Sequence, residues 1–205
     1  LWQEKQIVPF LKIDQGLANS TDGVQLMKPI HGLAKLLNKA VEHDVFGTKM
    51  RSLITQANGK AIHAAVEQQF SIAKQVLSTG LTPIIEPEIA INTPDKAAAE
   101  SLLSTALLTQ LDLLTTDQQV MLKITPPEIN NFYSACITHP RVLKVVALSG
   151  GYKREHANEK VAANTGMIAS FSRALTEGLS ICQTEQAFNA RLDASIEAIY
   201  QASKT

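Results

Sequence analysis

The chain has 205 residues, of which 45% are apolar and 19% are charged, and 19 basic residues balance 19 acidic ones. This composition is typical of a globular protein and excludes a disordered chain. A net charge of zero argues against nucleic acid as the main partner and against binding to a membrane surface, because both attract an excess of cations. The length fits a single domain, residues 1–205.

The sequence offers no localisation signal and no metal-binding pattern. It contains neither a signal-peptide pattern nor a long apolar run, so we expect a cytoplasmic protein. Cys136 and Cys182 are far apart, and the five histidines stand singly without the paired spacing of a metal site. We therefore expect two free thiols, no metal and no cofactor.

Six short apolar runs are predicted to be strands. They lie at residues 7–13, 45–50, 81–85, 120–124, 142–148 and 167–171. Each run is almost continuously apolar rather than alternating, which is typical of parallel strands that are buried on both faces.

Amphipathic stretches between these runs predict helices. Apolar stripes cover 33–41 and 62–77, the second closed by Gly80, and Thr93-Pro94 is expected to open a helix that includes 102–114. A further helix is expected over 129–136, and a last one after Thr184 over 188–199. Strands that alternate with helices predict one domain of repeated β/α units.

Charged residues recur where the predicted strands end. Lys12, Lys49, Glu86 and Lys123 follow one another at a constant spacing of 37 residues. Functional groups at the carboxyl ends of many parallel strands are typical of a (β/α) barrel, whereas a Rossmann-type sheet carries them only near its switch point. The pattern therefore favours the barrel over the doubly wound sheet.

Lys123 lies at the end of a strand that should be excluded from water, where an unpaired ammonium group costs free energy. A neutral amine there can attack a ketone and form an iminium. Glu86 ends the neighbouring strand and could move protons during that reaction, and Glu88 could orient the lysines. The alternative is that these carboxylates only neutralise Lys49 and Lys123.

Two loops after the last predicted strands could bind a phosphate. Ser149, Gly150 and Gly151 form a small strand-to-helix turn whose N–H groups can face an anion. Ser172 and Arg173 add a hydroxyl and a cation after the next strand, and barrels often bind phosphate between the loops of their last strands.

Six motifs in chain order resemble class I fructose-bisphosphate aldolase, bacterial branch. They are Phe-Leu-Lys-Ile-Asp-Gln-Gly, Gly-Thr-Lys-Met-Arg-Ser, Pro-Ile-Ile-Glu-Pro-Glu, Val-Met-Leu-Lys, Ala-Leu-Ser-Gly-Gly-Tyr and Ser-Phe-Ser-Arg-Ala-Leu. The resemblance implies a (β/α)8 TIM barrel that cleaves fructose 1,6-bisphosphate into dihydroxyacetone phosphate and glyceraldehyde 3-phosphate in glycolysis. It also implies a Schiff-base mechanism without a metal.

The same resemblance implies roles for individual residues. Lys123 would form the Schiff base, and Glu86 would accept and donate protons. The charged groups that would line the site and support these two are Lys12, Lys49, Arg51 and Glu88. The groups that would bind the substrate phosphate are Ser149, Gly150, Gly151, Ser172 and Arg173.

The resemblance further implies that the first two β/α units of the barrel are missing, which leaves strands 3–8 with their helices. Eight units of 37 residues would need roughly 296 residues, which is within the range of such barrels. We expect the runs at 7–13 and 167–171 to be unpaired sheet edges, and the 205 residues alone to be poorly soluble and weakly active or inactive.

Two other functions stay open from the residues alone. One is another lysine-dependent lyase or transferase for sugar phosphates, such as a transaldolase-like enzyme. The other is a non-catalytic protein that binds a sugar phosphate. In each case the expected partner is a small-molecule sugar phosphate, and the sequence leaves a homo-oligomer open.

Overall fold

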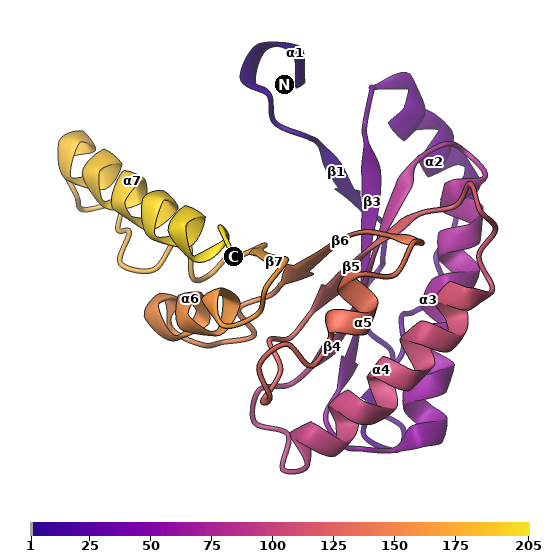
Figure 1. The fold of residues 1–205 in the computed structure, drawn as a ribbon. Helices are drawn as coiled ribbons and strands as arrows, with labels where there is room; N and C mark the ends of the chain where they lie inside the picture. Colours follow the sequence, from indigo (N-terminus) through magenta and orange to yellow (C-terminus); the bar gives the residue numbers. More distant parts are fainter. Residues whose placement is uncertain (1) are drawn as a thin grey trace.

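The computed structural model describes residues 2–205, with side chains from Glu4 onward. Helices and strands alternate along most of the chain (Figure 1). The strands are β1 Phe10–Lys12, β2 Val24–Gln25, β3 Gly47–Ile54, β4 Thr82–Ile89, β5 Val120–Ile124, β6 Val142–Ala147 and β7 Met167–Ala169. The helices are α1 Trp2–Lys5, α2 Leu33–Glu42, α3 Gly59–Leu77, α4 Lys96–Asp112, α5 Ser134–Ile137, α6 Arg154–Ala162 and α7 Glu185–Ala202.

The strands form one sheet in the order β1-β3-β4-β5-β6-β7, and every neighbouring pair on this path is parallel. These are the six strands expected from the apolar runs, in chain order. Strand β2, which pairs antiparallel with β3, was not predicted. It is two residues long, too short to leave an apolar run, and it follows a turn at Gly23, whose φ is 75°.

Among residues 2–205 the sheet stays open. Strand β1 pairs only with β3 and β7 pairs only with β6, so both are edges, as expected. Helices α2, α3 and α4 lie together on one side of β3 and β4, while α6 and α7 lie beside β7 (Figure 1). A parallel sheet with alternating helices and two free edges is consistent with a partial (β/α) barrel.

Side chains alternate in burial along β3 and β5, which corrects the expectation of burial on both faces for these two strands. Strand β4 is buried on both faces from Pro83 to Ile89, as expected. In β3, Met50, Ser52 and Ile54 are fully buried under the helices, whereas Lys49 and Arg51 are only partly buried. Because successive side chains point to opposite faces of a strand, the cations share the face away from the helices. Strand β5 alternates in the same way.

Strands β3 and β4 run beyond the ends expected from the apolar pattern, to Ile54 and Ile89. Arg51 and Glu86 consequently lie inside strands, where they are register partners, rather than at strand ends. The apolar runs stop at these charged residues, but backbone pairing depends on the main chain and continues through them.

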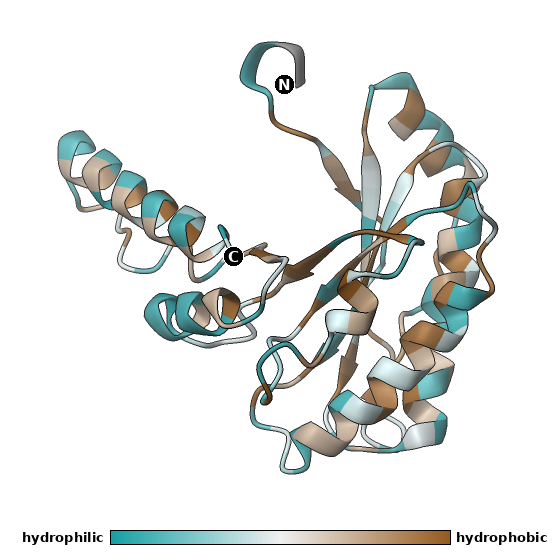
Figure 2. Cartoon of the chain, in the orientation of Figure 1, coloured by the Kyte–Doolittle hydropathy of each residue, from teal (hydrophilic) through white to brown (hydrophobic). Residues whose placement is uncertain are grey.

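The hydrophobic core lies between the sheet and helices α3 and α4. Helix α3 buries Ile62, Val66 and Phe70 completely, and α4 buries Leu103 and Leu107. Figure 2 shows apolar residues along the strands and on the faces of these helices that meet the sheet. Truncating Phe70 to alanine would cost about 3–5 kcal/mol, because a fully buried ring would leave a cavity.

Of four expectations about where helices begin and end, one is confirmed and three are wrong. Thr184 caps α7 by accepting a hydrogen bond from the Ala187 N–H at 3.2 Å. Helix α4 begins at Lys96 after Asp95, not at Thr93-Pro94, and α3 ends at Leu77, before Gly80. In the segment expected to be helical over 129–136, only Ser134–Ile137 is an α-helix, preceded by turns.

A buried ionic cluster ties the loop after β5 to helix α4. The Lys96 ammonium donates to the Glu100 carboxylate and to the Pro126 carbonyl oxygen, the latter at 2.9 Å, and pairs with Glu128 at 3.0 Å. The Glu100 carboxylate also accepts the Glu128 backbone N–H. The Lys96 side chain is only 5% exposed, so its charge is neutralised by these partners rather than by water.

No helix among the described residues is both long and apolar enough to span a membrane.

Candidate active site

Lys123 and Glu86 meet across two neighbouring strands. The Lys123 Nζ atom of β5 is 3.4 Å from Oε1 of Glu86, and Lys49 Nζ of β3 is 2.8 Å from Oε2 of the same carboxylate. Glu86 is only 5% exposed, and Lys123 is 16% exposed. One buried carboxylate therefore lies between two ammonium groups that come from the strands on either side of it.

Arg51 and Glu88 form a second ion pair next to the first. Arg51 Nε donates to Oε2 of Glu88 at 2.5 Å. Glu88 thus contacts an arginine rather than one of the lysines that it was expected to orient. Two carboxylates of β4 and the cations opposite them line the same face of the sheet.

Lys12 lies outside this cluster. Its side chain is 57% exposed, and its ammonium pairs with Asp14 at 2.6 Å and donates to the Asp14 carbonyl oxygen at 2.9 Å. Lys12 is the register partner of Lys49 on the adjacent strand, so its backbone is near the cluster even though its side chain turns to Asp14.

A polar cavity of about 390 Å³ opens beside these residues. Its lining consists of Arg51, Glu86, Glu88, Lys123, Leu148, Ser149, Gly150, Ser170, Ser172 and Arg173. Of the eleven residues named as candidates, only Lys12, Lys49 and Gly151 are absent from this lining, and Lys49 reaches it through its contact with Glu86. The cavity brings together residues from β3, β4 and β5 and from the loops after β6 and β7.

The turn after β6 is shaped by glycine. Gly150 has a φ of 59° and Gly151 a φ of 111°, which disfavour residues with a side chain. A Cβ at Gly150 would also come within 2.7 Å of the Ile91 side chain. The turn is closed by a hydrogen bond from the Tyr152 N–H to the Ser149 carbonyl at 2.8 Å, and it faces the cavity at Ser149 and Gly150.

Arg173 supplies an exposed cation to the lining of the cavity. In the described part of the chain it makes no ion pair, unlike Lys49, Arg51 and Lys123, so its charge is available to an anion. Ser170 and Ser172 lie in the same segment and add hydroxyl groups. Four cations against the two carboxylates of β4 leave a positive site, which suits an anionic ligand.

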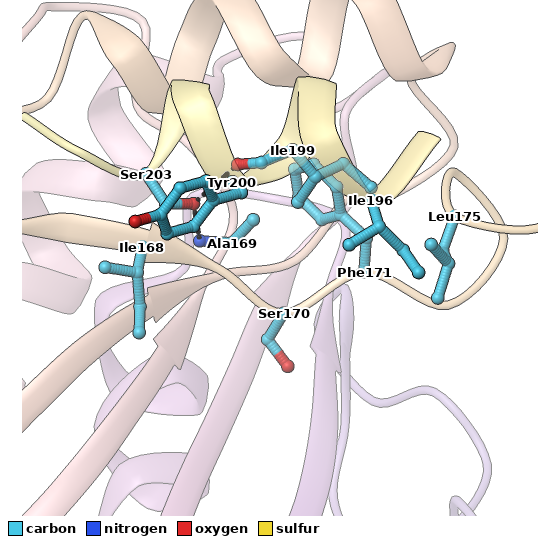
Figure 3. Close-up of a pocket in the computed structure, with 9 residues that line it drawn as sticks. All are labelled: Ile168, Ala169, Ser170, Phe171, Leu175, Ile196, Ile199, Tyr200 and Ser203. Carbon is cyan, nitrogen blue, oxygen red and sulfur yellow. Dashed lines mark hydrogen bonds between the residues drawn. The ribbon is translucent and has the colours of Figure 1, made fainter. Parts of the chain in front are cut away.

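A second hollow, between β7 and α7, is larger at about 510 Å³ but has no charged side chain (Figure 3). Ile168, Phe171, Ile196 and Ile199 contribute most of its apolar wall. The hydroxyl of Ser203 is already engaged with the Ala169 N–H and the Ile199 carbonyl, both drawn in Figure 3. With a mostly apolar wall and no cation in its lining, this hollow does not suit an anionic substrate.

Metal-ligating side chains and the two cysteines were the other groups considered, and neither cysteine lines the cavity. No group of three or more His, Cys, Asp or Glu side chains among residues 2–205 is arranged to hold a metal ion. Cys136 is buried, and burial raises the pKa of its thiol to about 11, against a smaller opposing effect of a hydrogen bond with Ser104. Cys182 is exposed and unpaired.

Two lining residues were not singled out from the sequence. Leu148 precedes Ser149 and forms an apolar part of the wall, and Ser170 precedes Phe171. Ser170 could have been noticed, because it is the one polar residue inside the apolar run at 167–171.

The open parallel sheet and the cavity at the carboxyl ends of its strands define the class of this protein, a (β/α)-barrel enzyme. A Porphyromonas gingivalis protein named "Fructose-bisphosphate aldolase class 1" is 59% identical over 203 residues, which cover 99% of this chain and 69% of that protein. Proteins of the same name from Synechocystis sp. and Clostridium acetobutylicum are 58% and 52% identical over 205 residues, covering 68% and 70% of their lengths. The chain belongs to the class 1 fructose-bisphosphate aldolases.

A solved structure agrees on the fold. The chain superposes on a fructose-bisphosphate aldolase from Plasmodium falciparum, solved in complex with TRAP and a small-molecule inhibitor, with a TM-score of 0.67 and 20% identity. The match covers 98% of this chain and 68% of that one. No protein-family model matches the chain. These relatives do not favour the transaldolase-like or non-catalytic alternatives.

Proposed function

We propose that this protein is a Schiff-base-forming lyase that cleaves fructose 1,6-bisphosphate into dihydroxyacetone phosphate and glyceraldehyde 3-phosphate. The observation that carries the proposal is the contact between Lys123 and Glu86 inside a positively charged cavity. The names of the relatives supply the substrate, and the cavity supplies a nucleophile, a proton carrier and an anion site in one place.

In this proposal the Lys123 amine attacks the C2 carbonyl of the open-chain ketose. Glu86, at 3.4 Å, first takes a proton from the Lys123 ammonium group, which frees the amine for this attack. It then gives that proton to the departing hydroxyl, so that the carbinolamine loses water and becomes an iminium. The iminium accepts the electron pair of the C3–C4 bond when that bond breaks. The Glu86 carboxylate, ionised again after the dehydration, takes the proton of the C4 hydroxyl and returns it to C3 in the next step. The aldehyde leaves, the resulting enamine is protonated at C3, and water then hydrolyses the imine and frees Lys123.

The surrounding charges hold these groups in place. Lys49 pairs with Glu86 at 2.8 Å and orients its carboxylate toward Lys123. Glu88 fixes Arg51, whose guanidinium faces the cavity. Lys12, held by Asp14 in the present arrangement, would contact charged substrate groups only after its side chain turns toward the cavity.

The ketose phosphate is assigned to the far wall of the cavity. Ser149 and Gly150 offer a hydroxyl and backbone N–H groups, and Arg173 offers a cation that forms charge-assisted hydrogen bonds with phosphate. Ser172 adds a hydroxyl beside Arg173. Gly151 contributes through the turn rather than as a lining residue.

The setting of the protein completes the proposal. Its partner is a small-molecule sugar phosphate, and it acts in the cytoplasm as part of glycolysis, without a metal. Residues 1–205 belong to a single domain, of which they form a partial barrel, and the protein can form a homo-oligomer. A net charge of zero supports a role away from nucleic acid and membrane surfaces.

Borohydride trapping tests the Schiff base. The full-length gene product is incubated with dihydroxyacetone phosphate, reduced with borohydride, digested and mapped by mass spectrometry. We expect a covalent adduct on the peptide that contains Lys123, lost in Lys123→Met but retained in Lys144→Met, a matched change on the next strand. An adduct on another lysine, or no adduct under any condition, would contradict the proposal.

A further inference from the structure

Gln69 is a buried polar residue that the proposed mechanism does not use. It lies on helix α3 with no exposed surface, among the apolar side chains that cover the sheet. Its amide nitrogen donates to Oγ of Ser52 on β3 at 2.7 Å, and its amide oxygen accepts the backbone N–H of Glu86 on β4 at 2.8 Å. One side chain therefore joins two strands of the candidate active site from the side opposite the cavity.

Strand β4 needs this support where the carboxylates lie. Its paired register with β5 covers Ile84 and Ile85, and the pairing does not extend to Glu86. Pro87 follows Glu86 and has no backbone N–H to donate. The stretch that carries both carboxylates is thus in register with β3 alone, whereas Ile84 and Ile85 are in register with strands on both sides.

A second side chain holds the far end of the same stretch. The hydroxyl of Thr125 donates to the Ile89 carbonyl at 2.6 Å and accepts the Ile89 N–H at 3.1 Å. Thr125 is buried and lies two positions after Lys123. Gln69 and Thr125 therefore hold the two ends of a segment that the β5 ladder leaves free.

The position of Glu86 matters because its carboxylate contacts two ammonium groups at once. A small shift of the backbone at Glu86 would lengthen the 3.4 Å contact to Lys123 or the 2.8 Å contact to Lys49. Losing Gln69 would also leave a buried N–H without an acceptor, and the strand would relax to satisfy it. A displacement of about 1 Å at a reacting group can cost about 100-fold in rate.

We propose that Gln69 is a positioning residue for Glu86: its amide, anchored on Ser52, fixes the Glu86 backbone so that the carboxylate meets Lys123. This inference rests on the proposed function, in which Glu86 carries protons. Gln69 does not reach the cavity and acts only through Glu86.

The test compares Gln69→Leu with Gln68→Leu in the full-length gene product. Leucine is close to glutamine in size and removes both hydrogen bonds. Gln68 is the matched control, because its amide also makes two hydrogen bonds from α3. They join it to the N–H and the carbonyl of Met27 at 2.8 and 2.9 Å, and neither residue lines the cavity. Both variants are assayed at a temperature where circular dichroism shows them folded.

We expect Gln69→Leu to lower kcat about 10- to 100-fold while KM changes little, because the proposed phosphate-binding groups lie on other strands. The pH profile of kcat should also shift, since the environment of the proton-carrying carboxylate changes. Gln68→Leu should keep the wild-type kcat and pH profile even where it lowers the melting temperature.

An unchanged kcat and pH profile in folded Gln69→Leu would overturn the inference, as would an equal loss in Gln68→Leu. If Gln69→Leu does not fold, Ser52→Ala replaces it. That change removes only the anchor of the Gln69 amide, so we expect a smaller fall in kcat with the same unchanged KM, and a wild-type kcat would overturn the inference. Failure of the proposed function is distinct, because the unaltered protein would then form no borohydride adduct.

Discussion

Lys123 and Glu86 face each other across the part of the sheet where the paired register of β4 and β5 has already ended. Their Nζ and Oε1 atoms are 3.4 Å apart, although the backbone pairing of the two strands stops at Ile85 and Leu122. Beyond that point the two strands are therefore in contact through these side chains. The contact places an amine and a proton carrier on either side of a space open to the cavity.

Glu86→Gln should lower kcat about 10²- to 10⁴-fold, because the amide cannot carry protons for the attached substrate. The protein should stay folded, since glutamine has nearly the same shape. Steady-state cleavage of fructose 1,6-bisphosphate measures the effect. The control is Glu67→Gln, a change at an exposed position on α3, which should leave kcat unchanged. Full activity in Glu86→Gln would exclude Glu86 from the mechanism.

Arg173→Ala should raise KM for the bisphosphate about 10- to 100-fold, because a charge-assisted hydrogen bond to phosphate contributes about 1.5–3 kcal/mol. The loss should shrink at high salt, where an exposed cation is screened. Arg191→Ala, which changes an exposed arginine on α7, should leave KM unaltered. Equal KM values for the two variants would argue against a phosphate at Arg173.

Lys96→Met should destabilise the fold by about 3–5 kcal/mol, since it leaves the buried Glu100 carboxylate without its cation. Urea unfolding followed by circular dichroism measures this, with the exposed Lys35→Met on α2 as the control. An unfolding midpoint equal to that of the control would contradict the structural role of the cluster.

The same cluster predicts a dependence of stability on pH. The hydrogen bond from Lys96 lowers the pKa of Glu128 below its ordinary value of 4.5. A lowered pKa contributes stability above the unfolded value and loses it as the pH falls through the folded one. Unfolding curves between pH 6 and about pH 3 should therefore show a shallower acid decline in Lys96→Met than in the unaltered protein.

The two cysteines should react with a thiol reagent at very different rates. Burial raises the pKa of Cys136 to about 11, so only about 0.1% of it is thiolate at pH 8, and it is also inaccessible. Cys182 is exposed. Titration of the native protein at pH 8 should show one thiol that reacts rapidly and is absent in Cys182→Ser. A second thiol should react only on unfolding. Rapid labelling of Cys136 in the native protein would contradict this and would mean that the core near α5 opens.

Much of the fold could be predicted because each strand is a compact apolar run. The runs failed to mark the ends of β3 and β4, since Arg51 and Glu86 interrupt the apolar pattern while backbone pairing continues. Helix α5 was predicted too long, because an apolar residue at every third or fourth position also fits a series of turns; Ile129 is in fact 63% exposed.

The candidate site was predictable to the extent that it depends on strand order. Equal spacing along the chain placed Glu86 beside Lys123, because parallel strands of similar length align their residues. It could not show that Lys12 turns to Asp14, since side-chain direction depends on neighbours. Gln69 was missed, although a polar residue seven positions after Ile62, on the same buried face of a helix, was a usable signal.

Because side chains alternate along β3, this strand cannot gain or lose a single residue without moving its functional groups to the other face. Lys49 and Arg51 share the face of the sheet away from the helices only because a single residue separates them. An insertion of one residue within Gly47–Ile54 would turn every later side chain to the opposite face, so that Arg51 would lie under the helices and an apolar residue would take its place. Insertions and deletions among homologues should therefore gather in the connections between elements, such as residues 113–119, and be absent from the strands that carry charged groups.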